Sequence, residues 1–390
     1  MRFHIVGLGP IGTLAAFHLR RAVPRSTPIS LIHRKPLHPQ REENVLKVER
    51  DGVVSIEDGF DVEYFPGSQT DTSMEATNPL TDIHSLIIAT KAQATFGVVE
   101  ALLPNLSRNS TIVLLQNGMG VYERLVETIF KNPANRPHFI CTVNTHGATM
   151  REARRHAIHR GLGALRFGIM PNINRDFEKS LRNPELPPEE RALSLSDISS
   201  EGDPQAERYQ SLLMTVAALS VMDLNPQWTP IETLQIAMYQ KLVANAIINP
   251  LTALLRCPNG ELLAHNATKN IALKVCTEAG TTFHKMYASR LDKEMRMMHA
   301  QGLAPRTQPQ VPRELWSSSL MEETMRIAEV TAKNTSSMLY DVLHARPTEV
   351  DFINGHICRL GKQYSVATPT TKTLWDLMQL RAAIPLDLIV

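Results

Sequence analysis

The chain has 390 residues, which is long for one compact domain and suits two. Its formal net charge of +2 excludes the domain-wide basic excess that is typical of a dedicated nucleic-acid-binding protein. Four cysteines stand alone, without a C-x-x-C pair, which indicates neither a zinc site nor a disulfide framework.

The chain opens on a short apolar segment, Phe3 to Val6, which predicts a β-strand. Because this strand starts at the third residue, no signal or transit peptide is expected before it. Apolar runs stay below the length of about 18 residues that would indicate a membrane-spanning helix. We therefore expect a cytosolic protein that meets no membrane, and a mitochondrial location is left open.

A glycine-rich loop, Gly7-Leu8-Gly9-Pro10-Ile11-Gly12, follows this strand at once and leads into a helical pattern. In such a loop the first glycine permits a tight turn, the second lets the backbone approach a pyrophosphate, and the third lets the helix pack on the strand. The pyrophosphate would then lie on the helix N-terminus, where free N–H groups favour negative charge. The alternative is a glycine-rich turn without a ligand.

Further strands are predicted over residues 29–32, 85–89, 111–115, 139–143 and 164–169, and they alternate with helical segments. This alternation is typical of a mostly parallel sheet covered by helices on both faces. We predict an α/β fold whose first domain, residues 1–171, is a Rossmann-type dinucleotide-binding domain.

The composition changes after this domain. Residues 172–204 are rich in proline and charge, and we interpret them as an insertion or linker outside the core, partly disordered. Helical patterns follow over residues 206–220, 231–249, 266–300 and 318–340. They predict an all-helical C-terminal domain over residues 205–390.

The end of the second strand bears on the choice of cofactor. It reads His33-Arg34-Lys35, and no carboxylate follows until Glu42. An NAD enzyme usually carries an Asp or Glu there for the ribose 2′-hydroxyl, whereas Arg34 can pair with a 2′-phosphate. The pattern favours NADP(H), unless Arg34 and Lys35 are only solvated loop cations.

A polar stripe in an apolar helix is the most informative feature. Lys241, Asn245 and Asn249 are spaced i, i+4, i+8, so they share one face of a helix whose other residues are Leu, Val, Ala and Ile. Such a stripe indicates a cleft in which each polar group needs a partner, or else a structural polar network. A lysine pKa near the ordinary value of about 10.4 would already suit a proton donor.

The densest basic run, at Arg151, Arg154, Arg155 and Arg160, lacks interleaved aromatic residues that could stack on bases. We interpret it as a solvated edge or turn rather than an RNA surface. The histidines form no metal-ligand spacing, and no metal is expected.

Several further motifs occur in one order along the chain. They are Thr90-Lys91-Ala92, Gln116-Asn117-Gly118-Met119-Gly120, Thr145-His146-Gly147-Ala148, Lys241-x-x-x-Asn245-x-x-x-Asn249-Pro250, Cys257-Pro258-Asn259-Gly260-Glu261-Leu262, Ser336-Ser337-Met338 and Thr348-Glu349-Val350-Asp351-Phe352-Ile353-Asn354-Gly355. Together with the glycine loop, they make the chain resemble the ketopantoate reductase (2-dehydropantoate 2-reductase) family from Phe3 to about Pro369.

The resemblance implies a Rossmann domain followed by a helical domain, and NADPH-dependent reduction of 2-dehydropantoate to pantoate for pantothenate and coenzyme A synthesis. It implies that Lys241 is the proton donor. The residues implied to bind substrate are Asn117, Asn245, Asn249, Asn259 and Ser337. Those implied at the cofactor are Gly7, Leu8, Gly9, Pro10, Ile11, Gly12, Arg34, Lys91, Asn117, Ala148 and Glu349.

Two other functions stay open on the sequence. One is NADPH-dependent reduction of a different branched 2-keto acid, because nothing in the sequence determines the shape of the pocket. The other is a non-catalytic NADP-binding sensor or interaction protein. In each case the expected ligand is a small molecule rather than nucleic acid, and a homodimer is left open.

Overall fold

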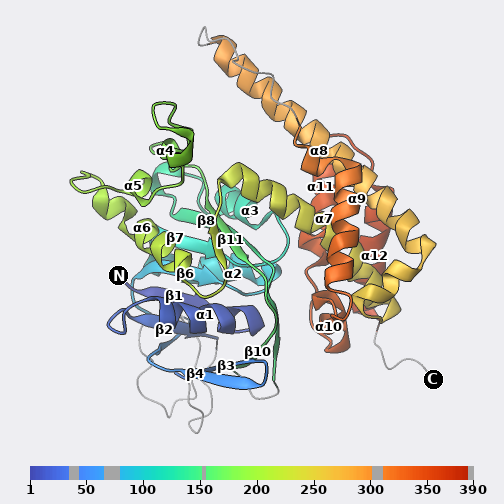
Figure 1. Ribbon diagram of the computed structural model, residues 1–390, viewed down its shortest axis with the longest axis horizontal. Helices are drawn as coiled ribbons and strands as arrows, with labels where there is room; N and C mark the ends of the chain where they lie inside the picture. Colours follow the sequence, from blue (N-terminus) through green and yellow to red (C-terminus); the bar gives the residue numbers. More distant parts are fainter. Residues whose placement is uncertain (35–43, 66–79, 152–154, 301–310, 385–390) are drawn as a thin grey trace. The chain divides into compact units, whose positions relative to one another are not determined.

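The computed structural model (Figure 1) describes residues 1–390 except 35–43, 66–79, 152–154, 301–310 and 385–390. It contains two compact units. Unit 1 comprises Met1–Gln116 and Val121–Leu234, and unit 2 comprises Asn117–Gly120 and Gln235–Val390. The boundary expected at residues 204/205 thus differs from the observed division, and a short loop of the N-terminal half belongs with unit 2.

The main sheet of unit 1 has eight strands in the order β12-β11-β8-β7-β6-β1-β2-β5. All neighbours are parallel except β8 and β11. The strands are β1 (Phe3–Val6), β2 (Ile29–His33), β5 (Asp61–Tyr64), β6 (Ile83–Ile88), β7 (Leu106–Leu114), β8 (His138–Asn144), β11 (Leu165–Ile169) and β12 (Pro226–Trp228). From β5 to β8 the order is that of a Rossmann fold, so the predicted fold class is confirmed.

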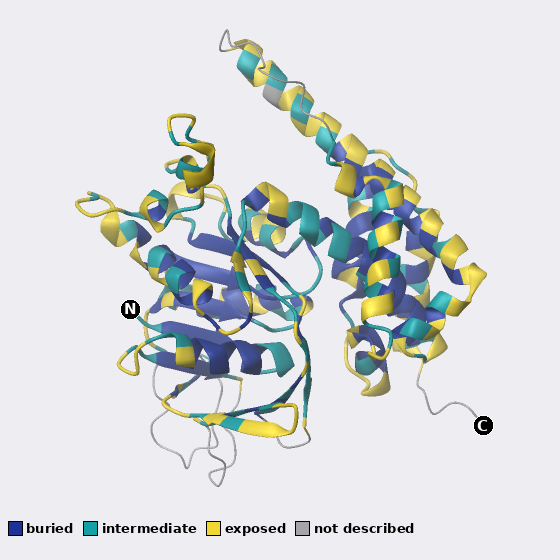
Figure 2. Cartoon of the chain, in the orientation of Figure 1, coloured by how far each residue is buried: buried dark blue, intermediate teal, exposed yellow. Residues whose placement is uncertain are grey.

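A second sheet of unit 1 was not predicted. It has the order β4-β3-β10-β9, with β3 (Leu46–Arg50), β4 (Val53–Glu57), β9 (Gly147–Met150) and β10 (His156–Gly161). Helix α1 (Pro10–Ala22) contacts β1 of the main sheet and all four strands of the second. Every residue of α1 from Gly12 to Arg20 is buried (Figure 2), as expected of a helix that is enclosed rather than laid on one sheet.

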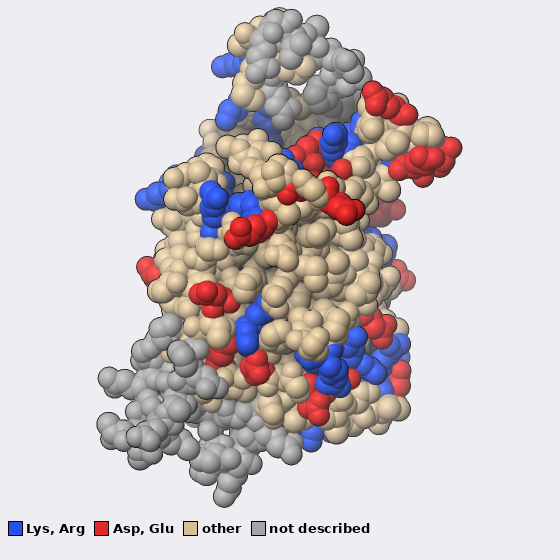
Figure 3. Space-filling view, turned by 90° about the vertical axis from the view of Figure 1, so that its left-hand side faces the viewer, with Lys and Arg blue, Asp and Glu red and all other residues tan. Residues whose placement is uncertain are grey.

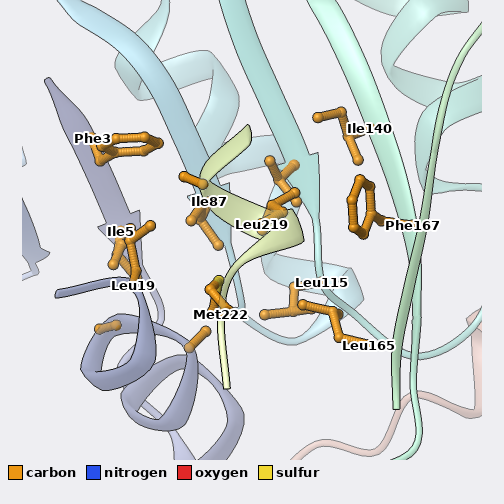
Figure 4. Close-up of a cluster of buried hydrophobic side chains, with 14 of the residues drawn as sticks. Phe3, Ile5, Leu19, Ile87, Leu115, Ile140, Leu165, Phe167, Leu219 and Met222 are labelled. Carbon is orange, nitrogen blue, oxygen red and sulfur yellow. The ribbon is translucent and has the colours of Figure 1, made fainter. Parts of the chain in front are cut away.

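The core of unit 1 is continuous from β1 to β11 (Figure 4). Phe3 and Ile5 from β1, Ile87 from β6 and Phe167 from β11 are at most 1% exposed. Helix α6 (Ala206–Ser220) adds Leu219 to this cluster and contacts β7, β6 and β12. Because α6 covers the sheet and β12 pairs with β11, residues up to Leu234 belong to unit 1. The remaining helices of unit 1 are α2 (Ala92–Leu102), α3 (Val121–Thr128), α4 (Lys179–Arg182) and α5 (Leu195–Ile198).

The segment 172–204, expected to lie outside the core, is anchored in it. Phe177 and Ile198 are 5% and 0% exposed and belong to the core cluster of unit 1. Arg175 bonds to the Asp203 carboxylate, and its guanidinium carbon lies 3.8 Å from the ring centroid of Tyr209. The interpretation as an external, partly disordered loop is therefore wrong, because two apolar side chains of the segment lie in the core and Arg175 packs on Tyr209 of α6.

Unit 2 is helical. Its helices are α7 (Ile231–Leu255, whose first four residues lie in unit 1), α8 (Asn266–Ala300), α9 (Ser317–Val330), α10 (Ser337–Leu343), α11 (Asn354–Gln363) and α12 (Pro369–Ala383). The one helix expected over residues 318–340 is two, because Ser336 caps a new helix by accepting the Leu339 N–H. Among the described residues, no helix combines the length and apolarity needed to cross a membrane.

Pro250 lies inside α7 and has no N–H to donate to the carbonyl of Ala246, four residues earlier. Asn354, the first residue of α11, compensates: its Nδ2 donates to the Ala246 carbonyl at 2.9 Å. The Asn354 side chain is completely buried, so water cannot take its place. This bond fixes α11 against α7 between Asn245 and Asn249.

We expect Asn354→Ala to lower the free energy of unfolding by about 1–3 kcal/mol, because a buried carbonyl loses its donor. Pro250→Ala restores the helical N–H, so in that background the same change should cost less. Chemical denaturation of the two single variants and the double variant measures the coupling. Equal losses in both backgrounds would show that Asn354 does not serve the carbonyl freed by Pro250.

A deletion tests the anchored segment. Replacing residues 174–200 by a short Gly/Ser bridge removes Phe177 and Ile198 from the core, which should destabilise unit 1 by at least about 3 kcal/mol. The matched control deletes only residues 183–191 and keeps both apolar side chains and the Arg175–Asp203 pair. We expect the control to unfold near the parent in urea, and two equally stable deletions would contradict the anchoring.

Candidate active site

The glycine loop lies where the strand order reverses. Strand β1 is flanked by β2 on one side and β6 on the other, which is the point at which open α/β sheets bind ligands. The loop after β1 touches the loop after β6 closely: a Cβ placed on Gly7 would lie 2.3 Å from the Thr90 nitrogen. Lys91 follows at once and occupies the N-cap position of α2, without a capping hydrogen bond from its side chain. The structure thus places Lys91 beside the glycine loop.

The three glycines of the loop, Gly7, Gly9 and Gly12, are needed for different physical reasons. Gly7 has φ +92, and a Cβ on Gly12 would lie 2.0 Å from the Gly7 carbonyl oxygen, so the turn itself excludes side chains at both positions. Gly9 has extended dihedrals, φ −76 and ψ −170, and no atom of the described residues lies within 4 Å of a Cβ placed there. Among these residues, neither the backbone nor its packing needs glycine at this position, so the space before α1 is available to a pyrophosphate. Pro10 starts the helix, where its missing N–H is harmless, and Leu8 and Ile11 pack on the core.

Cationic groups gather at the end of β2. Arg34 follows β2 directly and is exposed. Arg155, which precedes β10, is only 7% exposed, and its Nη2 lies 3.2 Å from Nε2 of His33. For Arg155 the interpretation as a solvated edge is therefore wrong, whereas Arg151 does lie at the surface and pairs with Glu49. Lys35, Glu42 and Arg154 lie outside the described residues.

Ala148 is half-buried in β9, where it pairs with His159 and packs on the core of unit 1. Its position in the second sheet explains why strand patterns alone did not place it.

On the face shown in Figure 3, acidic and basic side chains are interspersed. Among the described residues, no three His, Cys, Asp or Glu side chains gather as metal ligands would.

In unit 2, two glycines shape the loop Asn117–Gly120. Gly118 has φ +83, and a Cβ on it would lie 2.6 Å from the Phe352 carbonyl oxygen. Gly120 has φ +91, and a Cβ on it would lie 2.7 Å from Nδ1 of His356. The Met119 N–H donates to the same Phe352 carbonyl at 2.9 Å. Burial, reinforced by Arg359, lowers the pKa of His356 to about 3, so this ring stays neutral against the loop. These contacts hold Asn117 in place.

Lys241 meets that asparagine. Its Nζ donates to Oδ1 of Asn117 at 2.9 Å, across 124 positions of sequence. Burial lowers the pKa of Lys241 to about 8, and the charge of the buried Glu349 opposes this shift. An ammonium with this pKa releases a proton far more readily at neutral pH than a solvated one does.

The predicted stripe is present on α7. Asn245 is half-buried and Asn249 is 7% exposed, one and two helical turns beyond Lys241 on the same face. The structure thus brings together Lys241, Asn117 and Glu349, with the two asparagines following along the helix.

Asn259 and Ser337 make their contacts on other elements. Asn259 begins the 3₁₀ helix η4 (Asn259–Ala264), and its Nδ2 donates to Thr331 at 2.9 Å. Its Oδ1 is buried and has no hydrogen-bond partner among the described residues, so it can accept from a ligand hydroxyl. Ser337 is exposed at the start of α10, and the adjacent Ser336, 2.7 Å from Thr252 of α7, anchors that end.

Sequence reasoning gave no site role to four residues: Arg155 at the end of β2 in unit 1, and Phe352, Asn354 and His356 around Asn117 and α7 in unit 2. Two signals pointed to some of them. A proline inside a helix, Pro250, requires a donor for the freed carbonyl, and two glycines in four residues require a close surface. Neither signal identifies which distant residue answers it.

Comparison with known proteins identifies the family. The N-terminal part, residues 3–172, matches the family model described as ketopantoate reductase PanE/ApbA. Residues 233–382 match the model of the ketopantoate reductase PanE/ApbA C terminal. The two matches leave out most of the anchored segment and α6.

Relatives match over nearly the whole chain. A 2-dehydropantoate 2-reductase of Vibrio cholerae is 25% identical over 376 residues, covering 96% of this chain and 96% of its own. A probable 2-dehydropantoate 2-reductase of Schizosaccharomyces pombe is 27% identical over 383 residues, covering 97% and 95%.

Solved structures share the fold. A PanE/ApbA family ketopantoate reductase from Ralstonia eutropha superposes with a TM-score of 0.62 at 18% identity, covering 98% of this chain and 99% of that one. D-mandelate dehydrogenase, in a ternary structure with NADH and anilino(oxo)acetate, gives a TM-score of 0.65 at 18% identity with the same coverage. With family models matching both units over most of its length, the chain belongs to the ketopantoate reductase family.

Proposed function

We propose that this chain reduces 2-dehydropantoate to pantoate with NADPH. The observation that carries the proposal is the amine of Lys241, buried enough to lower its pKa to about 8 and hydrogen-bonded to Asn117. Membership in the ketopantoate reductase family supports the substrate, and the open space at Gly9 supports a dinucleotide.

When bound, the nicotinamide supplies the hydride that attacks the 2-keto carbon. Negative charge then develops on the carbonyl oxygen, and the Lys241 ammonium stabilises that charge and transfers its proton to the oxygen. Asn117 orients the ammonium, because its Oδ1 accepts a hydrogen bond from one N–H group of Lys241. The nearby carboxylate of Glu349 favours the protonated form of Lys241, which keeps a proton available despite the burial.

The remaining polar groups bind the substrate in this proposal. Asn245 and Asn249 provide amide donors for the substrate carboxylate along the same helix face. The unpaired Oδ1 of Asn259 accepts from the substrate hydroxyl, and Ser337 contributes a hydroxyl from the start of α10. These groups are neutral, so they bind an anionic substrate without competing with Lys241 for the developing charge.

The cofactor contacts come from the loops at the switch point. Gly7, Gly9 and Gly12 shape the pyrophosphate site, Lys91 adds a cation beside it, and Ala148 offers backbone. Arg34 takes the 2′-phosphate, and the proximity of Arg155 to His33 at the end of β2 adds positive charge there. Glu349 is assigned to the cofactor as well as to the Lys241 environment.

A second candidate is reduction of another 2-keto acid. It is favoured by the structural likeness to D-mandelate dehydrogenase, whose solved complex contains NADH and an oxo acid analogue. An NADPH-oxidation assay of the purified protein against a panel of 2-keto acids distinguishes the two substrates. A non-catalytic sensor would oxidise NADPH with none of them.

Replacing the proton donor should affect chemistry before binding. We expect Lys241→Ala to lower kcat by about two to four orders of magnitude, the usual contribution of a general acid, while the Kd for NADPH changes little. The control variant, Lys274→Ala on the exposed side of α8, should keep the kcat and the Kd for NADPH of the parent. In the parent, kcat for reduction should fall as pH rises through about 8, because Lys241 loses its proton there.

The melting temperature measured beside kcat separates catalysis from structure. If Lys241 only completes a polar network, its replacement lowers stability by about 1–3 kcal/mol and activity falls only with the folded fraction. A destabilised variant whose folded molecules turn over normally would refute the catalytic role.

Cofactor preference gives an independent test. We expect the parent to bind NADPH much more tightly than NADH, and Arg34→Ala to weaken NADPH binding about 10- to 100-fold, as for loss of a charged hydrogen bond. NADH binding should change little, and Arg108→Ala, at another exposed arginine of unit 1, should affect neither. Equal affinities of the parent for the two cofactors would overturn the assignment.

A further inference from the structure

The side-chain amide of Asn259 is held by a threonine on another element of unit 2. Its Nδ2 donates to Oγ1 of Thr331 at 2.9 Å, directly after the end of α9. The same Oγ1 lies 2.6 Å from the carbonyl of Ile327, and the Thr331 N–H donates to that carbonyl at 3.0 Å. Thr331 thus joins the C-terminal end of α9 to the first residue of η4.

The hydroxyl of Thr331 determines which way this amide points. A threonine hydroxyl has one hydrogen and a carbonyl oxygen can only accept, so that hydrogen is donated to Ile327. Toward Asn259 the hydroxyl can therefore only accept, which requires the NH₂ group of the amide and excludes its oxygen. The oxygen, Oδ1, is buried and has no hydrogen-bond partner among the described residues, so it is the group left for a ligand.

The backbone at Asn259 is fixed on the same turn. The Asn259 N–H donates to the carbonyl of Asn334 at 3.1 Å, and the Gly260 N–H donates to the carbonyl of Ala332 at 2.9 Å. A Cβ on Gly260 would lie 2.7 Å from Cβ of Ala332, so only glycine permits this approach. Because the backbone is fixed, rotation of the amide is the freedom that the Thr331 hydroxyl removes.

The same turn leads to other residues assigned to the substrate. Ser336 follows it, and its Oγ lies 2.7 Å from Oγ1 of Thr252 on α7. Oγ1 of Thr252 also lies 3.1 Å from the carbonyl of Asn249. The turn therefore connects Asn259 to Ser337, the next residue after Ser336, and to the helix that carries Asn249.

We propose that Thr331 is a positioning residue that makes the site selective for 2-keto acids bearing a hydroxyl donor. The inference rests on the proposed function, in which Asn259 binds the substrate. Thr331 holds the amide so that Oδ1 accepts a hydrogen bond from the substrate hydroxyl. A substrate with a methyl group in that place leaves the buried Oδ1 unpaired, and a site built for a hydrogen bond rejects such an analogue.

Trimethylpyruvate provides the comparison, because it is 2-dehydropantoate with a hydrogen in place of the hydroxyl. Calorimetry of the full chain with excess NADP⁺ measures the Kd of each keto acid without turnover. We expect the parent to bind 2-dehydropantoate about tenfold more tightly than trimethylpyruvate, as for one hydrogen bond. Thr331→Val, which keeps the shape and lacks the hydroxyl, should remove most of this preference by weakening 2-dehydropantoate alone. Thr331→Ser should retain it.

Two further variants separate this role from a structural one. Thr277→Val removes an exposed hydroxyl on α8 that bonds to the carbonyl of Leu273 at 2.7 Å in the same way, and it should keep the preference. Asn259→Ala should lose the preference, and adding Thr331→Val to it should change the ratio of the two Kd values no further, because Thr331 acts through that amide.

Four outcomes would overturn the inference: no preference in the parent, an unchanged preference in Thr331→Val whatever its melting temperature, a loss in Thr331→Ser, or an effect of Thr331→Val that persists beside Asn259→Ala. The proposed reduction fails by a different result, which is the absence of NADPH oxidation with 2-dehydropantoate. Reduction with an unchanged ratio in Thr331→Val would refute only the role of Thr331, and binding of neither keto acid would refute both.

Discussion

The partly buried amine of Lys241 is the constraint on which the candidate active site depends. Removing an ammonium from water is unfavourable unless oxygen atoms replace the lost hydration. Asn117 supplies one oxygen at 2.9 Å, and Glu349 supplies opposite charge. Asn117 lies 124 positions earlier in the sequence, so this environment exists only when the chain brings two distant segments together. Burial destabilises the charged form of Lys241, and for that reason the ammonium releases its proton more easily.

Much of unit 2 can be understood as support for that environment. The loop Asn117–Gly120 approaches Phe352 and His356 so closely that only glycine fits at two of its four positions. The proline of α7 frees a carbonyl inside the helix, and Asn354 binds it from α11. Phe352, Asn354 and His356 are neighbours in sequence. One short stretch therefore positions both the loop that carries Asn117 and the helix that carries Lys241.

In unit 1, packing explains two glycines of the glycine loop, and space for a ligand explains the third. Gly7 and Gly12 are required by the turn and by the close approach of α1 to the loop after β6, whereas no described residue lies close to a Cβ placed on Gly9. Contacts of α1 with two sheets explain why its residues from Gly12 to Arg20 are all buried, the polar Thr13, His18 and Arg20 included. The apolar residues of segment 172–204 have a similar explanation, since Phe177 and Ile198 complete the core beside α6.

The sequence by itself determined the fold class and the residue types of the site. The strand before Gly7, the alternation of strands and helices, and the spacing of Lys241, Asn245 and Asn249 depend on local periodicity, which is legible without coordinates. The ordered motifs likewise indicated the family. Local patterns did not predict the features that depend on distant parts of the chain. These are the second sheet, the anchoring of segment 172–204, and the buried state of Arg155. Only the tertiary structure decided that Lys241 meets Asn117 and has a pKa of about 8, because burial and partners across 124 residues are properties of the folded chain and not of any local pattern.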